Sequence, residues 1–193
     1  MPSNDNVTEL LDAWSQKKPG ALEALMEVVY EELRAMAGSF FKAERREHTL
    51  QPTALVHELY AKLTDQHSVN WHGRKEFFAV AARGMRHILV DHARKQKRLK
   101  RGGGPEGGIV RVSLDEALGV PDEVAPDFIV LDGALEKLER LHPRQARIVE
   151  MRILVGLTLE EVAAVEKISR ATVAREWRTA RLFLMQQLQA ESA

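Results

Sequence analysis

The sequence predicts an all-α fold of two small helical domains joined by a flexible linker, with a helix-turn-helix as the C-terminal domain. Apolar residues recur at helical spacing through most of residues 8–99 and 143–188. Glycine, proline and acidic residues dominate the stretch between them, and closely spaced helix start and stop signals follow Pro143. We therefore expect domains at residues 1–101 and 131–193, with a linker at residues 102–130.

Composition excludes several classes of protein. The chain has 193 residues, no cysteine and a formal net charge of +0, so disulfides and thiolate metal sites are excluded. No apolar run approaches the roughly 20 residues of a membrane span, and the polar N-terminus lacks a signal-peptide pattern. We expect a cytoplasmic protein without a membrane partner. Its charges are segregated, with cations at residues 83–111 and 170–181 and acids at residues 115–132 and in the N-terminal helices, which favours simultaneous binding of DNA and a basic protein partner.

The first helices are predicted at residues 8–14, 21–41 and 53–63. The third has an apolar stripe, and its outer face carries His57, Glu58 and Lys62. His57 and Glu58 match the start of a zinc-protease motif, but Ala61 stands where the second histidine belongs, so no metal is expected.

The loop at residues 65–75 concentrates stacking and hydrogen-bonding side chains, among them Asn70, Trp71, His72 and Arg74. One interpretation is that this loop receives an unstacked nucleic-acid base. The other is that Trp71 fills the domain core and the remaining residues form a polar turn. The sequence alone leaves both open.

A helix is predicted at residues 76–99, with an apolar face opposite a basic one. We call the cations of that face the basic ridge: Arg83, Arg86, His87, Arg94, Lys97 and Arg98. Asp91 is the only acid between Phe77 and Gly102, so the ridge has no counter-charge within its helix and we expect it to contact phosphate. The alternative is a solvated helix face. His92 follows Asp91, but a helix crowded with arginines is a poor place for a metal, so no cofactor is expected.

The stretch after Pro143 predicts three helices. The first runs from Pro143 to Gly156, the second opens with a Thr158–Glu161 capping box, and the third begins at a Ser169 cap and ends near Leu188. The third helix packs through an apolar stripe, and a polar face opposite is available to a DNA major groove: Ser169, Thr172, Arg175, Arg178 and Thr179. The alternative is a plain helical bundle with solvated arginines.

This stretch resembles the promoter-binding domain of extracytoplasmic-function sigma factors, small members of the sigma-70 class of bacterial RNA polymerase subunits. The resemblance is carried by Leu141, Pro143, Arg147, Gly156, Thr158, Glu161, Ala163, Ser169, Thr172, Val173, Trp177, Ala180, Arg181 and Leu184. The N-terminal half resembles the promoter-melting domain of the same family through residues 52–60, Trp71, Phe77, Phe78, Ala81, Ala82, Met85, Arg86, residues 88–94, Lys97 and Arg98. At the helix-turn-helix turn the family usually has leucine then glycine, whereas this chain has Glu166 and Lys167, and a lysine with positive φ would be strained.

The resemblance implies a sigma factor that binds core RNA polymerase and recognises promoter DNA, with no catalysis of its own. It implies contacts with the β′ clamp helices through Leu55, His57, Glu58 and Lys62. It also implies a contact with the β flap, and an anti-sigma factor is a further candidate partner. The minus-ten element would be opened and read by Trp71, His72, Arg74 and the basic ridge, and the minus-thirty-five element by the polar face of the last helix. The acidic linker would thread a polymerase channel, unless it is a plain solvated tether.

Three alternatives have different signatures. A conventional helix-turn-helix regulator would bind duplex DNA tightly without polymerase, usually as a dimer. A metal-dependent nuclease would need a cluster of carboxylates or histidines, which the sequence lacks. A protein-interaction adaptor would have no need of an arginine-rich face.

Overall fold

The computed structural model describes residues 4–40, 50–64, 71, 73–101 and 128–192. These residues form eight α-helices and no strand, which confirms the predicted all-α class. The helices are α1 (Asn4–Ser15), α2 (Ala21–Phe40), α3 (Pro52–Thr64), α4 (Arg74–Arg101), α6 (Phe128–Leu141), α7 (Pro143–Ile153), α8 (Leu159–Glu166) and α9 (Arg170–Ser192). None of the described helices is both long and apolar enough to cross a membrane.

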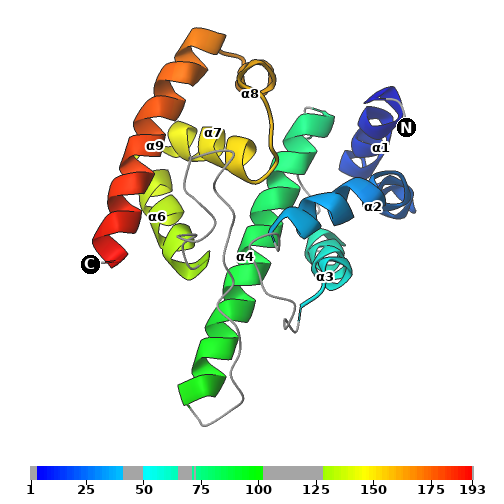
Figure 1. The fold of residues 1–193 in the computed structure, drawn as a ribbon. Coiled ribbons are helices and arrows are strands. Elements are labelled where there is room, and N and C mark those ends of the chain that lie inside the picture. Colours follow the sequence, from blue (N-terminus) through cyan, green and yellow to red (C-terminus); the bar gives the residue numbers. More distant parts are fainter. Residues whose placement is uncertain (1–3, 41–49, 65–70, 72, 102–127, 193) are drawn as a thin grey trace.

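In the N-terminal group, α1, α2 and α3 pack against the first half of α4 (Figure 1). The buried residues of α2, α3 and α4 follow the predicted helical period, and the apolar stripes of these helices meet in one core. Gly20 ends the turn between α1 and α2 at φ +76°, a conformation that glycine adopts without steric cost.

The C-terminal helices, α6 to α9, form a second group in which α6, α7 and α9 contact one another and α8 packs on α9. α6 is absent from the helices predicted above, and its first three residues fall within the predicted linker range. Its apolar stripe is nevertheless visible in the sequence, since Leu131, Ala134, Leu135 and Leu138 are buried at intervals of three and four residues. Residues 102–127 of the predicted linker lie outside the described residues.

The two groups of helices are packed together along α4, which lies between them in Figure 1 and contacts both α6 and α7. One cluster of buried apolar side chains includes residues of both groups, from Val7 to Leu188. A second cluster, under α8 and α9, also takes in Ala79 of α4. The two groups of helices are therefore closed on each other and share a core.

Candidate nucleic-acid interface

The start of α8 is fixed by the predicted capping box. The Thr158 hydroxyl oxygen accepts a hydrogen bond from the Glu161 N–H at 3.2 Å, and the Glu161 carboxylate accepts one from the Thr158 N–H at 2.9 Å. The hydrogen bond from the Thr158 backbone lowers the pKa of Glu161. These reciprocal bonds confirm the predicted start of α8.

In the turn between α8 and α9, a lysine occupies the left-handed conformation in which lysine is strained. Lys167 has φ 54° and ψ 40°, the left-handed conformation that favours glycine, and its N–H donates to the Ala163 carbonyl. The neighbouring Glu166 accepts two hydrogen bonds from the Arg147 guanidinium, both at 2.9 Å. The turn thus keeps the backbone conformation of a glycine cap, and the ion pair between Glu166 and Arg147 connects it to α7.

α9 begins at the predicted cap, because the Ser169 hydroxyl oxygen accepts from the Thr172 N–H at 3.1 Å. The helix is docked by Val173, Ala180 and Leu184, which are fully buried. The opposite face presents the predicted DNA-contacting residues to solvent, with Thr172 half-buried and the others exposed: Ser169, Thr172, Arg175, Arg178 and Thr179.

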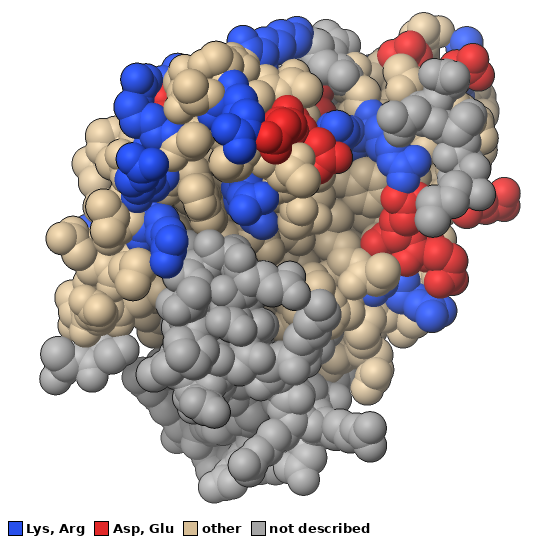
Figure 2. Space-filling model, turned by 45° about the horizontal axis from the view of Figure 1, so that its top comes forward, with Lys and Arg blue, Asp and Glu red and all other residues tan. Residues whose placement is uncertain are grey.

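The arginines of this face differ from those around them. Arg144, Arg147 and Arg170 are paired with Glu176, Glu166 and Glu160 respectively. Within the part of the chain that the structure describes, no ion pair engages Arg175 or Arg178. Figure 2 shows Lys and Arg gathered on the side of the molecule formed by the C-terminal helices. The exposed face of α9 therefore offers two uncompensated guanidinium groups to an anionic partner.

The basic ridge on α4 is divided by the C-terminal helices. Arg94 and Arg98 are exposed. In contrast, Arg83 donates from Nε to Glu150 Oε2 at 2.8 Å, and only 1 % of Arg86 is exposed. Among the described residues, no acid of α4 neutralises the ridge, but the inference that its counter-charge must come from outside the protein is wrong at Arg83 and Arg86, and Arg94 Nη2 also lies 3.5 Å from Asp132 Oδ2.

The counter-charges come from α6 and α7. The Arg86 guanidinium lies 3.6 Å from Asp132 Oδ1 and 3.3 Å from Glu150 Oε1. We call Arg83, Arg86, Asp132 and Glu150 the ion-pair cluster. Burial raises the pKa of Asp132, although Arg86 and Arg94 act in the opposite direction. Partial burial, and then the adjacent Arg86 charge, lower the pKa of His87, whose Nε2 lies 3.1 Å from Arg86 Nη2.

The structure favours the core-filling interpretation of Trp71. This side chain is 7 % exposed, stacks on Trp14 with a centroid distance of 5.2 Å, and makes a T-shaped contact with Phe77 at a centroid distance of 5.6 Å. The ring is therefore covered by protein and is not open to a base. Arg74, predicted beside it, pairs with Glu32. His72, Asn70 and the Lys97 side chain lie outside the described residues.

The predicted polymerase-binding residues of α3 fall on two different faces. Leu55 is fully buried in the apolar core, because it belongs to the stripe that packs on α2 and α4, so it is not available to a partner. His57 and Glu58 are exposed on the outer face. Lys62 also lies there and is 3.7 Å from Asp91 of α4.

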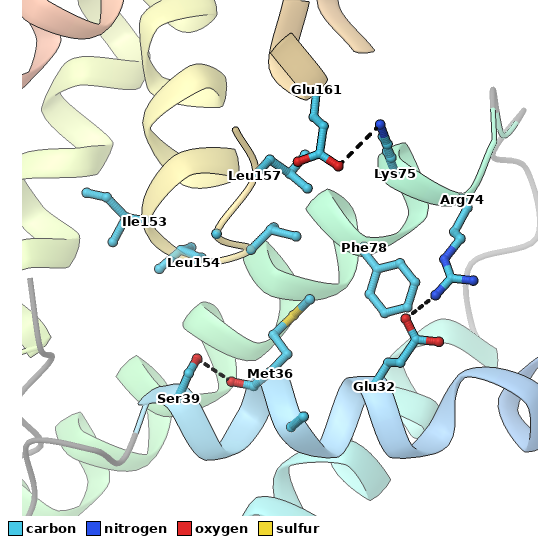
Figure 3. Close-up of a pocket in the computed structure, with 13 residues that line it drawn as sticks. Glu32, Met36, Ser39, Arg74, Lys75, Phe78, Ile153, Leu154, Leu157 and Glu161 are labelled. Atoms are coloured by element: carbon cyan, nitrogen blue, oxygen red, sulfur yellow. Dashed lines mark hydrogen bonds and ion pairs between the residues drawn. The ribbon is translucent and has the colours of Figure 1, made fainter. Parts of the chain in front are cut away.

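A pocket of about 720 Å³ lies between α2, α4 and the segment that joins α7 to α8 (Figure 3). Met36, Phe78 and Leu157 supply part of its apolar lining. On one side it is bordered by an ion pair between Lys75 and Glu161, 3.5 Å apart, which links α4 to α8. The two groups of helices are therefore incompletely packed against each other here. Among the described residues, no group of three or more potential metal ligands is present.

Comparison with known proteins gives one match. The family model described as ECF sigma factor matches residues 4–190. No curated protein and no solved structure matches the chain.

Proposed function

The chain belongs to the ECF sigma factor family, and from that membership we propose that it binds core RNA polymerase and directs it to specific promoters. The family places the chain in transcription initiation. In the proposed function the chain performs no catalysis. It works in the cytoplasm with polymerase and promoter DNA as partners, and an anti-sigma factor is a further candidate.

The outer face of α9 is the observation that carries promoter recognition. Arg175 and Arg178 are exposed one turn apart, and the opposite side of the helix is held by buried apolar residues. A helix that docks in this way can enter a major groove, where guanidinium groups pair with guanine edges or phosphates. Ser169 and Thr172 lie at the helix N-terminus, where backbone N–H groups attract phosphate. We assign this face to the minus-thirty-five element, with α8 and α9 as the helix-turn-helix.

The basic ridge supports a second contact, with the minus-ten element. Arg94 and Arg98 already face solvent on the second half of α4. Arg83 and Arg86 lie on the same helix, closer to its N-terminus. Both become available to phosphate when the C-terminal helices separate from α4. We assign no contact with the minus-ten element to Trp71, because its side chain is buried in the core.

The outer face of α3 supports a contact with the polymerase. His57 and Glu58 are exposed and Lys62 is partly exposed, so this face has both signs of charge and no role in the core. We assign it to the β′ clamp helices, and we assign the β flap to the C-terminal helices. Residues 1–101 and 131–193 would then act as the two binding units joined by residues 102–130.

Run-off transcription with purified components tests the proposed function. Core polymerase supplemented with this protein should transcribe a subset of genomic promoter fragments that core polymerase alone leaves silent. Tight binding to duplex DNA without polymerase, combined with no transcript from any fragment, would instead indicate a conventional helix-turn-helix regulator.

A further inference from the structure

The ion-pair cluster joins the two groups of helices through residues that also belong to the basic ridge. We propose that Arg83, Arg86, Asp132 and Glu150 form an intramolecular latch that holds the C-terminal helices on α4 and withholds the two arginines from nucleic acid. The inference rests on the proposed function, because it regulates the same phosphate-binding surface.

The latch encloses three of its four charged groups. Arg86 is 1 % exposed, Asp132 2 % and Glu150 3 %. Arg83 donates two hydrogen bonds, from Nε and Nη2, to the same Glu150 oxygen. The Arg83 side chain is still 33 % exposed, but the two N–H groups that donate to Glu150 are occupied. Closure therefore excludes nucleic acid from the buried Arg86 and competes with it for Arg83.

The closed state leaves its buried charges incompletely bonded. Arg86 Nε, Arg86 Nη1 and Asp132 Oδ1 are buried without a hydrogen-bond partner among the described residues. The 3.6 Å between Arg86 Nη1 and Asp132 Oδ1 is too long for a hydrogen bond. A buried ion pair stabilises a fold only when its remaining donors and acceptors are satisfied, because desolvation otherwise offsets the attraction. The pocket bordered by Lys75 and Glu161 shows that the apolar contact beside it is also incomplete.

A polyanion is the partner that fits the released surface. Two exposed cations of the ridge give it a first site on the same helix: Arg98, and Arg94, which is half-exposed and lies 3.5 Å from Asp132. Release of Arg83 and Arg86 then adds two cations in line with that site. If only the open form binds with these arginines, the apparent dissociation constant equals the intrinsic one divided by the open fraction.

The test uses the full chain without polymerase and a labelled single-stranded oligonucleotide of mixed sequence as the probe. The first variant is Ala79→Gln, because Ala79 of α4 packs against the second apolar cluster of the C-terminal helices. The larger polar side chain separates the two groups and leaves the net charge unchanged. We expect fluorescence anisotropy to show affinity increased about tenfold or more, the gain for a minor open population. The salt dependence should also steepen by about 1.4 log units per log unit of salt, for two added phosphate contacts.

A second variant opens the latch by charge. Asp132→Asn with Glu150→Gln should give a similar gain in affinity. Its matched control is Asp12→Asn with Glu27→Gln, which makes the same change in net charge at exposed positions of α1 and α2. Circular dichroism establishes that each variant keeps its helices.

Two outcomes would overturn the latch. One is unchanged oligonucleotide affinity in both folded variants. The other is a gain that persists when Arg83→Ala and Arg86→Ala are added to Ala79→Gln, because those arginines would then not be the groups released. Run-off transcription with the unchanged chain is a separate measurement. Unchanged oligonucleotide affinity in the variants would refute the latch but not the sigma-factor proposal. Absence of transcripts would refute the sigma-factor proposal and would leave the oligonucleotide affinities unaffected.

Discussion

Arg175 and Arg178 are the residues on which promoter recognition depends most directly. Both guanidinium groups are exposed on α9, and neither is paired within the described part of the chain. Replacing either with alanine should weaken binding of the reconstituted polymerase to its promoter by about 1–3 kcal/mol if the side chain contacts a base edge. Binding is measured as the dissociation constant for a labelled promoter fragment.

The matched control for this charge change is Arg34→Ala on α2, an exposed arginine that pairs only with Glu31 of its own helix among the described residues. It should leave promoter affinity as it is in the unchanged chain. If Arg175→Ala and Arg178→Ala also leave it unchanged, α9 is not the recognition helix.

Lys167 shows how a single residue stores strain in the turn before that helix. Its φ of 54° is costly for lysine and free of steric cost for glycine. Lys167→Gly should therefore raise the free energy of unfolding by up to about 1 kcal/mol, measured by urea denaturation. Lys95→Gly is the control, because an exposed lysine inside α4 should lose about 1 kcal/mol on the same change. If both variants are less stable than the unchanged chain, the backbone of Lys167 is not strained.

His87 makes stability depend on pH. Its pKa in the folded protein is lowered by partial burial and then by Arg86. The unfolded chain, whose imidazole titrates near 6.5, therefore binds more protons than the folded chain as pH falls below that value. Stability should fall between about pH 6.5 and the lowered pKa, and His87→Gln should remove that part of the fall.

Urea midpoints for both proteins at a series of pH values measure this difference. Asp132 acts with the opposite sign, because its pKa is raised and the folded chain therefore holds its proton more tightly, and it is present in both proteins. Superimposable pH profiles would mean that the environment of His87 does not change on unfolding.

At the scale of the helices, Gly84 allows α3 and α4 to approach each other closely. A Cβ added at Gly84 would lie 2.7 Å from Leu59 Cδ1, and Leu59 is fully buried. Gly133 of α6 is exposed and has no atom within 4 Å of the same added Cβ. Both sites gain helix propensity on substitution by alanine, so the overpacking should make Gly84→Ala less stable than Gly133→Ala by about 1–3 kcal/mol. Thermal unfolding of the two variants checks this, and equal melting temperatures would contradict it.

Helices and caps were predictable where the signal is local. The Thr158–Glu161 capping box and the Ser169 cap each depend on residues within one turn of the chain. α6 was not predicted, because its apolar repeat is short and follows a stretch rich in proline and acidic residues. Trp71 was undecided for a different reason: the ring that covers it, Trp14, lies far away in the sequence.

At the scale of the whole molecule, the pairing of Arg83 with Glu150 joins residues 67 positions apart. Helical periodicity assigns a side chain to a face of its own helix, but it says nothing about which acid another helix will bring to that face. The ridge was therefore predicted as a set of cations, whereas the closure that neutralises two of them was not.

A distance measurement between the two groups of helices tests the account most directly. The chain has no cysteine, so Glu27→Cys on α2 and Gln186→Cys on α9, both exposed, give one unique dye pair. Single-molecule energy transfer should show one short distance in the free protein and a longer one after assembly with core polymerase and promoter DNA, when the two groups separate to reach the two promoter elements. A complex that initiates transcription while retaining the short distance would contradict the account.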